Sequence, residues 1–232
     1  MRTAPITLSL IFLAGAACAG ERPRGVVELF TSQGCSSCPP ADRILADLAR
    51  DPSLIVLSLP VDYWDYIGWK DTLASPACTA RQKDYAAARG DGQVYTPQAV
   101  VDGLVHVVGS DRDAVLATVD AHKKALGVDV SAKVENSGVS VDVGAGAGRR
   151  ASVWLFEIEP QATVAVGRGE NAGHTLTYTN IVRKMTRLGD WTGKPAHYAA
   201  RTEARPGDRY VALVQTGAEQ TPGEIVGAAQ TN

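Results

Sequence analysis

The chain has 232 residues, which is enough for two small domains, and its apolar fraction of 45% is ordinary for a globular protein. The formal net charge is −2 and no cluster of Lys and Arg stands out, so neither a nucleic acid nor an acidic membrane surface is indicated as a partner. No segment beyond the N-terminal one is apolar for long enough to cross a membrane, so no stable membrane span is expected.

The N-terminal segment has the features of an export signal. Arg2 supplies a positive start, residues 6–17 form an apolar stretch too short to span a bilayer, and the Ala-Cys-Ala sequence at 17–19 is a small-residue cleavage site. We therefore expect residues 1–19 to be removed after Ala19, and the mature protein to be periplasmic or secreted. The alternatives are a core helix and a lipoprotein whose lipid is carried by Cys18.

A β-α-β unit follows the signal. Residues 25–30 and 54–59 are short apolar runs typical of buried parallel strands. Between them an amphipathic helix is expected to begin near Cys35 and to stop before Pro52. The unit predicts two parallel strands joined by a right-handed crossover.

An insertion and a hairpin complete an expected N-terminal α/β domain over residues 20–127. The insertion, about residues 62–92, is rich in aromatic residues at its front and helical from Pro76 to Arg89. Two short strands then follow, joined by Asp102-Gly103, which is a strong hairpin signal. A last helix is expected over residues 111–126.

From residue 128 onward, alternating apolar and polar residues replace this pattern. Short runs of this kind, separated by turn residues, predict an antiparallel sheet or sandwich. We therefore expect a β-rich, sandwich-like C-terminal domain over residues 128–232.

Cys35 and Cys38 are the residues most informative about chemistry. A cysteine at the start of a helix faces unpaired N–H groups and the positive end of the helix dipole, which lower the pKa of its thiol. Cys35 is thus expected to attack a disulfide, and Cys38, one turn further on, to resolve the mixed disulfide. Glu28, in the preceding strand, either shuttles the proton of Cys38 or lies at the strand edge in contact with solvent.

Thr96 and Pro97 open the strand that follows the insertion. Proline has no backbone N–H, so it suits the start of a strand. A cis bond at this position would turn the backbone of Thr96 toward whatever lies in front of the sheet. Thr96 and Pro97 are therefore expected to position a substrate chain by backbone pairing.

Three functions are compatible with the cysteine pair. The first is thiol–disulfide oxidoreduction on a protein or a small thiol or disulfide, with no cofactor and no metal. The second is copper(I) binding by Cys35 and Cys38, with His106 as a further ligand or as a strand histidine facing solvent. A zinc site is less well supported, because Cys78 is the only additional thiol and suits a buried apolar position. The third is a binding module that no longer exchanges disulfides.

Two other stretches have two interpretations each. The aromatic residues of DYWDYIGW, at 62–69, either receive an apolar segment of a substrate beside Cys35 or form a small core beneath the insertion. The loop GRGENAGHTLTY, at 167–178, either closes over the cysteine pair or forms a long hairpin. It is not a phosphate-binding loop, and no hydrolase motif accompanies it.

Taken together, a strand, a CxxC at a helix start, and a Thr-Pro before a hairpin and a last helix resemble the thioredoxin fold. In that fold the proline is cis and packs beside the cysteines, which implies a cis Thr96–Pro97 bond. The stretches VVELFTSQGCSSCPPAD, VDYWDYIGWKD, VYTPQAVVDG and RGENAGHTLTYTNIVR are similar to an uncharacterised family of secreted bacterial proteins with a thioredoxin-like N-terminal domain. This resemblance implies a redox-competent pair at Cys35 and Cys38 and implies no substrate.

Overall fold

The computed structural model describes residues 22–121, 126–135, 138–146, 150–202 and 207–231. The predicted signal and its cleavage site at Ala19 lie outside these described residues. The first elements are β1 (Gly25–Thr31), α1 (Cys38–Leu48), β2 (Leu54–Pro60), the 3-10 helix η1 (Asp65–Ile67), α2 (Pro76–Arg89), β3 (Gln98–Val101), β4 (Val105–Val108) and α3 (Arg112–Ala121). They are followed by β5 (Val130–Glu135), β6 (Gly138–Val143), β7 (Ala151–Ala165), β8 (Thr175–Trp191), β9 (Ala196–Arg201), β10 (Arg209–Ala218) and β11 (Thr221–Gln230).

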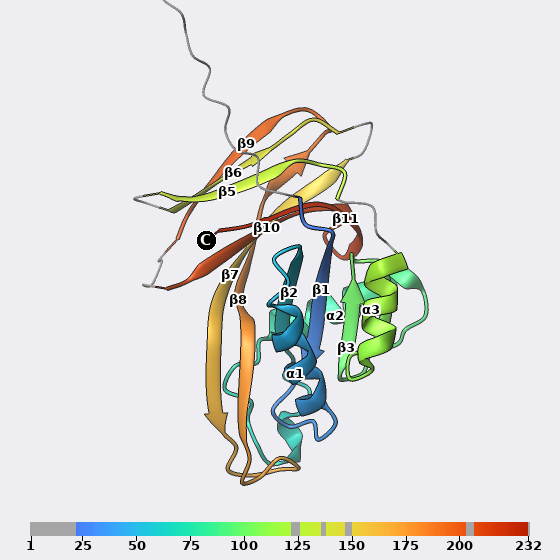
Figure 1. Ribbon diagram of the computed structural model, residues 1–232, viewed down its shortest axis with the longest axis vertical. Coiled ribbons are helices and arrows are strands. Elements are labelled where there is room, and N and C mark those ends of the chain that lie inside the picture. The colour runs from blue at the N-terminus through green and yellow to red at the C-terminus, as the bar shows by residue number, and fades with distance from the viewer. Residues whose placement is uncertain (1–21, 122–125, 136–137, 147–149, 203–206, 232) are drawn as a thin grey trace, which may run out of the picture.

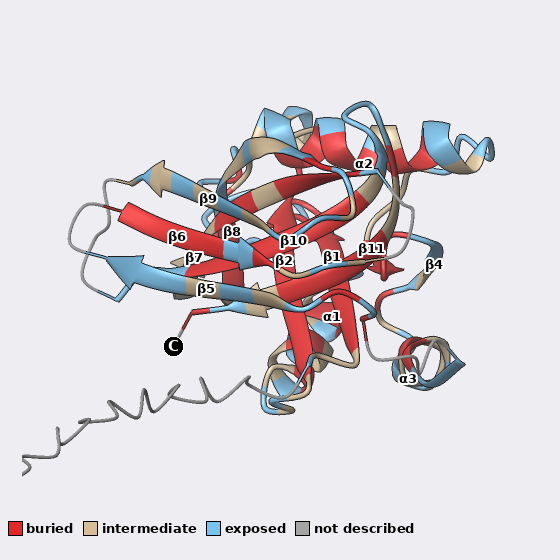
Figure 2. Ribbon diagram, turned by 90° about the horizontal axis from the view of Figure 1, so that it is seen from above, coloured by how far each residue is buried: buried red, intermediate tan, exposed pale blue. Residues whose placement is uncertain are grey.

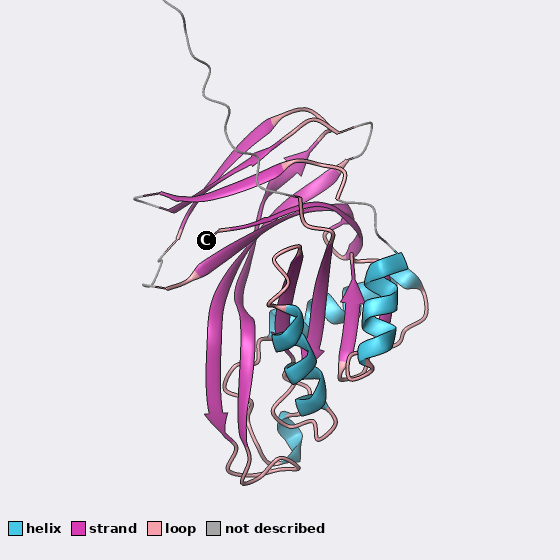
Figure 3. Cartoon of the chain, in the orientation of Figure 1, coloured by secondary structure: helices cyan, strands magenta, loops and turns pink. Residues whose placement is uncertain are grey.

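The strands form two sheets. The larger is an eight-stranded mixed sheet in the order β11-β10-β7-β8-β2-β1-β3-β4, and the smaller is a three-stranded antiparallel sheet in the order β5-β6-β9 (Figure 1). The helices lie beside the β1–β4 half of the large sheet, while the small sheet covers the other half (Figure 3). The fold is therefore mixed α/β, with a second antiparallel sheet contributed by the later part of the chain.

The first half follows the sequence-based expectation closely. β1, β2 and α2 occupy the predicted residues, and α2 ends at Gly90, whose φ of +76° is the left-handed conformation that glycine adopts readily. The predicted hairpin is also present, with positive φ at both Asp102 and Gly103. α3 covers the first part of its predicted range, and residues 122–125 lie outside the described chain.

The large sheet crosses the predicted domain boundary near residue 127. Its β1–β4 half and its β7–β11 half meet where β2 runs parallel to β8, with Ser58 opposite Ile181. Asn180, at a φ of +52°, reinforces this short junction by donating from Nδ2 to the carbonyl of Val56 at 3.1 Å. Strands on both sides of the boundary thus share one sheet, and the division into two domains stays a prediction.

β7 and β8 form a long hairpin that extends past the rest of the sheet (Figure 1). β7 contains Pro160, a residue that cannot donate a hydrogen bond to a neighbouring strand. In the structure Ile158 is the last β7 residue that pairs with β10, so the missing N–H of Pro160 lies on an unpaired edge. The loop of this hairpin, residues 166–174, therefore lies well away from β10, β11 and the small sheet (Figure 1).

Strands β1, β2 and β3 and most of β10 are buried on both faces, whereas β4, β5 and β9 remain partly or largely exposed (Figure 2). Along β10, Tyr210, Ala212 and Val214 pack against the small sheet, and Val211 and Leu213 between them join the main core on the opposite face. A continuous apolar run is what a strand covered on both faces requires. The main core includes side chains from both halves of the sheet and from α2, so the sheet wraps around this helix.

A buried ion pair fixes α2 against the sheet. Arg81 contacts both carboxylate oxygens of Glu28 on β1, at 2.6 and 3.0 Å, and the two side chains are 7% and 0% exposed. Tyr85 donates its hydroxyl to Glu28, and Gln215 on β10 accepts from Arg81 at 3.0 Å. The Arg81 guanidinium also lies over the rings of Tyr85 and Phe156, at 4.9 and 5.1 Å.

We expect Arg81→Ala to lower the free energy of unfolding by about 3–5 kcal/mol, because it leaves the Glu28 carboxylate buried without its partner. Lys184→Ala is the matched control, since it breaks the exposed ion pair between Lys184 and Glu157 and should cost less than about 1 kcal/mol. Urea denaturation of both variants measures the difference. Equal losses in the two variants would show that the buried pair does not hold α2 in place.

Candidate functional site

A disulfide joins Cys35 and Cys38 at the carboxyl end of β1, with the two Cα atoms 5.4 Å apart. The sequence-based expectation that the helix begins near Cys35 is corrected: α1 begins at Cys38, and Ser37 is its N-cap residue. Pro39 and Pro40 explain this position, because proline is tolerated only in the first turn of a helix. Cys35 therefore lies in the loop that precedes the helix.

The backbone amides around Cys35 are largely occupied. The N–H of Gln33 donates to Asp71 at 2.7 Å, and that of Ser36 donates to Glu170 at 3.2 Å. Pro39 and Pro40 have no N–H to offer. Fewer donors are thus free to stabilise a Cys35 thiolate than at an ordinary helix start.

A direct polar contact to the Cys35 sulfur comes from Ser37, whose Oγ lies 3.4 Å from Sγ. The hydroxyl can donate to a thiolate at this position. Both sulfurs are nevertheless buried, since Cys35 is 2% exposed and Cys38 is 0% exposed. Ser36 and Ser37, which separate the two cysteines, are exposed, so the disulfide lies just beneath the surface.

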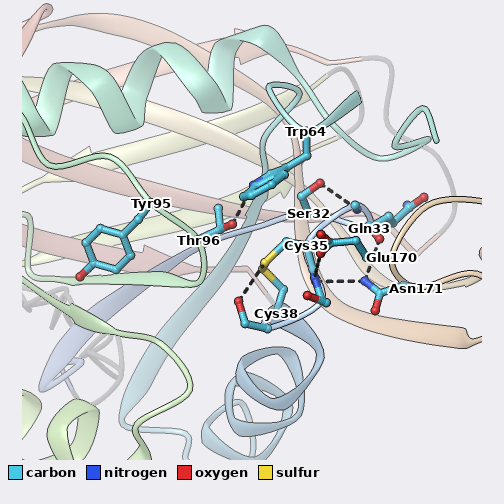
Figure 4. Close-up of a disulfide and its surroundings, with 12 residues drawn as sticks. Ser32, Gln33, Cys35, Cys38, Trp64, Tyr95, Thr96, Glu170 and Asn171 are labelled. Carbon is cyan, nitrogen blue, oxygen red and sulfur yellow. Dashed lines mark hydrogen bonds between the residues drawn. A yellow bond between two sulfur atoms is a disulfide. The ribbon is translucent and has the colours of Figure 1, made fainter. Parts of the chain in front are cut away.

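The β7–β8 loop contacts the cysteine loop directly (Figure 4). Asn171 is buried and donates from Nδ2 to the carbonyls of Gln33 and Cys35, at 2.9 and 3.0 Å. Glu170 accepts from the Ser36 amide, and its interactions with the Ser36 side chain and then with that amide lower the pKa of Glu170. The loop is therefore both the hairpin turn and the cover of the cysteine loop that the sequence offered as alternatives.

The aromatic segment also packs against the cysteine loop. Trp69 donates from Nε1 to the Gln33 side chain at 2.8 Å, and Trp64 donates from Nε1 to the Thr96 hydroxyl at 2.8 Å. Gly34 permits this packing, because a Cβ at that position would lie 3.0 Å from the Cβ of Trp64. Tyr66 stacks on Trp64 and is 80% exposed, so this segment combines packing with an aromatic surface.

The Thr96–Pro97 bond is cis, as the resemblance implied. Pro97 lies close to the first turns of α1, with Gly109 beside both. A Cβ placed on Gly109 would lie 3.4 Å from the Cβ of Pro97 and 3.5 Å from the Cβ of Ala41 on α1. Figure 4 shows Thr96 beside the disulfide, with Trp64 above both. The structure thus brings Cys35, Cys38, Thr96 and Pro97 together at one end of the sheet.

Glu28 lies elsewhere. Its neighbours Val27 and Leu29 face α1, whereas Glu28 faces α2 and is held by Arg81. The expectation of a solvent-exposed carboxylate at the strand edge is wrong, because Glu28 is 0% exposed. The helix that begins with Cys38 lies on the opposite face of β1 from Glu28, and the proton-transfer role of Glu28 stays a prediction.

The other candidate ligands are also accounted for. His106 contacts the Tyr95 hydroxyl at 2.8 Å and the Asp91 carboxylate at 3.2 Å. Cys78 is a free thiol buried in the main core, and burial raises its pKa to about 12. Within the described parts of the chain, no group of three or more His, Cys, Asp or Glu residues is arranged to hold a metal ion.

Two buried acids at the site were missed from the sequence. Asp71 accepts the N–H groups of Gln33, Leu73 and Ala74, at 2.7, 2.8 and 3.1 Å, and burial raises its pKa. Asp42 lies on the buried side of α1, where its only sequence signal is an acid on an otherwise apolar helical face. Sequence patterns did not link Asp71 to the cysteines, because Asp71 contacts the cysteine loop through the backbone N–H of Gln33, which is distant in sequence.

The chain belongs to the family described as "Protein of unknown function (DUF1223)", whose model matches residues 26–215. It is similar to the crystal structure of protein AGR_C_4864 from Agrobacterium tumefaciens, with 37% sequence identity and a TM-score of 0.81 over 91% of this chain and 95% of that one. HBP35 of Porphyromonas gingivalis has a similar fold at 11% identity, with a TM-score of 0.63 over 90% of this chain and 75% of that one. No curated protein matches this sequence.

None of the helices within the described residues is both long enough and apolar enough to cross a membrane.

We expect Asn171→Ala to loosen the cysteine loop, because the carbonyls of Gln33 and Cys35 lose their shared donor. The free energy of unfolding should fall by about 1–3 kcal/mol, and dithiothreitol should reduce the disulfide faster. Arg168→Ala, at an exposed position of the same loop, is the control and should change neither quantity. Unchanged reduction kinetics in Asn171→Ala would show that the β7–β8 loop does not restrain the cysteines.

Proposed function

We propose that this protein is a thiol–disulfide oxidoreductase whose exchanging bond is Cys35–Cys38, carried by a thioredoxin-like unit over residues 25–121. The proposal rests on one observation: the disulfide and the cis Thr96–Pro97 bond lie together beside α1. The strand order β2-β1-β3-β4 supports the thioredoxin-like unit, with β2 parallel to β1 and β3 antiparallel to it. A cysteine pair that only cross-linked the chain would not need a cis proline beside it.

The exchange proceeds through a mixed disulfide. A substrate thiolate attacks Cys35 Sγ, the Cys35–Cys38 bond breaks, and Cys38 leaves with the bonding electron pair. A second substrate thiolate then attacks the substrate sulfur of the mixed disulfide and displaces Cys35, so the substrate becomes a disulfide and the protein a dithiol. The reverse sequence reduces a substrate disulfide. The Ser37 hydroxyl, 3.4 Å from the Cys35 sulfur, stabilises the thiolate in both directions.

The surroundings of Cys35 favour the reducing direction. Strong oxidants of this class stabilise the thiolate of the attacking cysteine. Here the amides of Gln33 and Ser36 are taken by the carboxylates of Asp71 and Glu170, and both carboxylates add negative charge to the loop that carries Cys35. A less stable thiolate favours the disulfide form of this protein, and therefore transfer of electrons to a substrate.

The substrate side of the site combines backbone and aromatic surface. Thr96, beside the disulfide, offers its backbone to an extended chain, and the exposed ring of Tyr66, stacked on Trp64, offers an apolar surface. This arrangement suits a peptide or a small disulfide. We place the activity in the periplasm or outside the cell, because the sequence of residues 1–19 has the features of an export signal and an oxidising compartment maintains disulfides.

The order of attack is tested by reacting cysteine variants with glutathione disulfide and measuring the mixed disulfide by mass. Cys38→Ser should form a stable adduct at Cys35, and Cys35→Ser should react at least about tenfold more slowly, because Cys38 is 0% exposed. Cys78→Ala is the control, because its thiol is buried far from solvent. Faster reaction at Cys38 would reverse the assigned order.

The same experiment separates the competing functions. If neither cysteine forms an adduct, the disulfide is a structural bond and the protein is a binding module. Titration of the reduced protein with copper(I) against a competing chelator tests the copper alternative. Tight binding of one copper(I) without glutathione exchange would replace the proposed function.

The contribution of Glu170 is tested by its charge. Glu170→Gln should make the reduction potential of the pair less negative, and Glu170→Lys should shift it further in the same direction, because each change favours the Cys35 thiolate. Glu219→Gln, in the exposed turn between β10 and β11, is the control for a general change of net charge. A potential that is the same in all four proteins would show that Glu170 does not set the direction of transfer.

A further inference from the structure

Asp42 occupies an unusual position for a carboxylate. It lies on α1 four residues after Cys38, which places the two side chains on the same helical face about 5–6 Å apart at their Cβ atoms. Both residues are buried: Cys38 is 0% exposed and Asp42 is 5% exposed. The neighbours of Asp42 on that face are apolar, namely Ala41, Leu45 and Leu48.

The carboxylate of Asp42 has no hydrogen-bond partner among the described residues, at either oxygen. Two hydroxyls around it, Thr31 on β1 and Tyr178 on β8, are also buried without partners in the described part of the structure. Thr31 approaches Asp42 closely enough to influence it, but in a geometry that falls short of a hydrogen bond. Buried polar groups are almost always paired, so three unpaired groups at one place call for an explanation.

The charged groups that face Asp42 do not compensate for its burial. Asp71, in the loop before α2, adds a second negative charge, while Arg43 on α1 offers a weaker positive influence. Burial is the largest effect and raises the pKa of Asp42 from 3.8 to about 8. The carboxyl is therefore mainly protonated at neutral pH, and it holds that proton beside Cys38.

A structural role does not explain this residue. Its pKa is higher in the folded than in the unfolded chain, so the folded state binds more protons between the two values. Stability is then greatest below pH 3.8 and declines as the pH rises toward about 8. An uncharged residue of similar size would avoid that loss, so Asp42 weakens the fold at the pH of function.

We propose that Asp42 is the proton donor and acceptor of Cys38 in disulfide exchange. This proposal rests on the proposed function and assigns to Asp42 the role that the sequence had offered to Glu28. When a substrate thiolate attacks Cys35, the sulfur of Cys38 leaves as a thiolate and takes the proton of Asp42, which becomes a carboxylate. When Cys38 later resolves a mixed disulfide, it returns its proton to Asp42 and attacks Cys35 as a thiolate.

The buried position gives this transfer a physical advantage. Cys38 is 0% exposed, so water does not reach its sulfur as it leaves. A thiolate without a proton source would be stranded in an apolar environment, which is costly. The neutral Asp42 carboxyl supplies the proton at the moment the charge develops, and the small Thr31 and Tyr178 hydroxyls are placed to bind the carboxylate that results.

The test compares wild type with Asp42→Asn, which keeps the size of the side chain and removes its transferable proton. The rate of disulfide reduction by dithiothreitol is measured from pH 6 to 10 and divided by the concentration of attacking thiolate. In wild type this corrected rate should fall with a midpoint near 8, as Asp42 loses its proton. In Asp42→Asn the rate at pH 7 should be about 100-fold lower, with no such midpoint.

Asp47→Asn is the matched control, because it makes the same substitution at an exposed position of the same helix; it should behave as wild type. The free energy of unfolding of Asp42→Asn relative to wild type should also be higher at pH 8 than at pH 4. If Asp42 had a structural role, the substitution would instead lower the stability at pH 8. A variant that exchanges at the wild-type rate, or that loses stability at pH 8, overturns the proposal. If wild type itself is not reduced at any pH, the proposed function fails instead.

A second measurement uses the unaltered protein. The carboxyl-carbon NMR signal of Asp42, in ¹³C-labelled protein, is followed against pH in the oxidised and the reduced state. The proposal expects a midpoint near 8 in the oxidised state and a different midpoint once Cys38 is a thiol, because the two groups share a proton. Titration below pH 5, or the same midpoint in both states, overturns it whether or not the variant folds.

Discussion

The structure depends on one buried ion pair, Arg81 with Glu28, and on the helix that carries the arginine. Neither charge can be removed alone without leaving the other in an apolar core. Glu28 belongs to β1, and Gln215, which accepts from the same guanidinium, belongs to β10 on the other half of the sheet. The pair therefore holds both halves of the eight-stranded sheet around α2, while the short parallel pairing of β2 with β8 joins the two halves in the sheet itself.

That arrangement leaves the cysteine loop at the carboxyl end of β1, where two segments distant in sequence converge on it. Asn171 and Glu170 come from the β7–β8 loop, Trp69 and Asp71 from the insertion, and all four bond to the stretch from Gln33 to Ser36. The long β7–β8 hairpin has a purpose in this account, because it carries a C-terminal segment to an N-terminal site. The sulfurs are consequently buried and held by polar contacts that also determine the local charge.

Much of this could be predicted from local patterns. The β-α-β unit, the limits of α2, the hairpin at Asp102-Gly103 and the meeting of Thr96 with the cysteine pair depend on short-range signals or on a family resemblance, and the structure agrees with them. The surroundings of Glu28 could not be predicted, because its partner Arg81 lies in a different element. Asp42 was missed for a related reason: burial and the lack of a partner are tertiary properties that no motif records.

The central claim is that Cys35–Cys38 is an exchange disulfide kept toward the reducing side by the charges around it. The most direct test is the reduction potential of the mature protein, measured by alkylation and mass after equilibration with glutathione. We expect a reversible couple between about −200 and −270 mV. A potential below about −300 mV would mean a structural bond, and one near −120 mV would mean a strongly stabilised thiolate; either value contradicts the account.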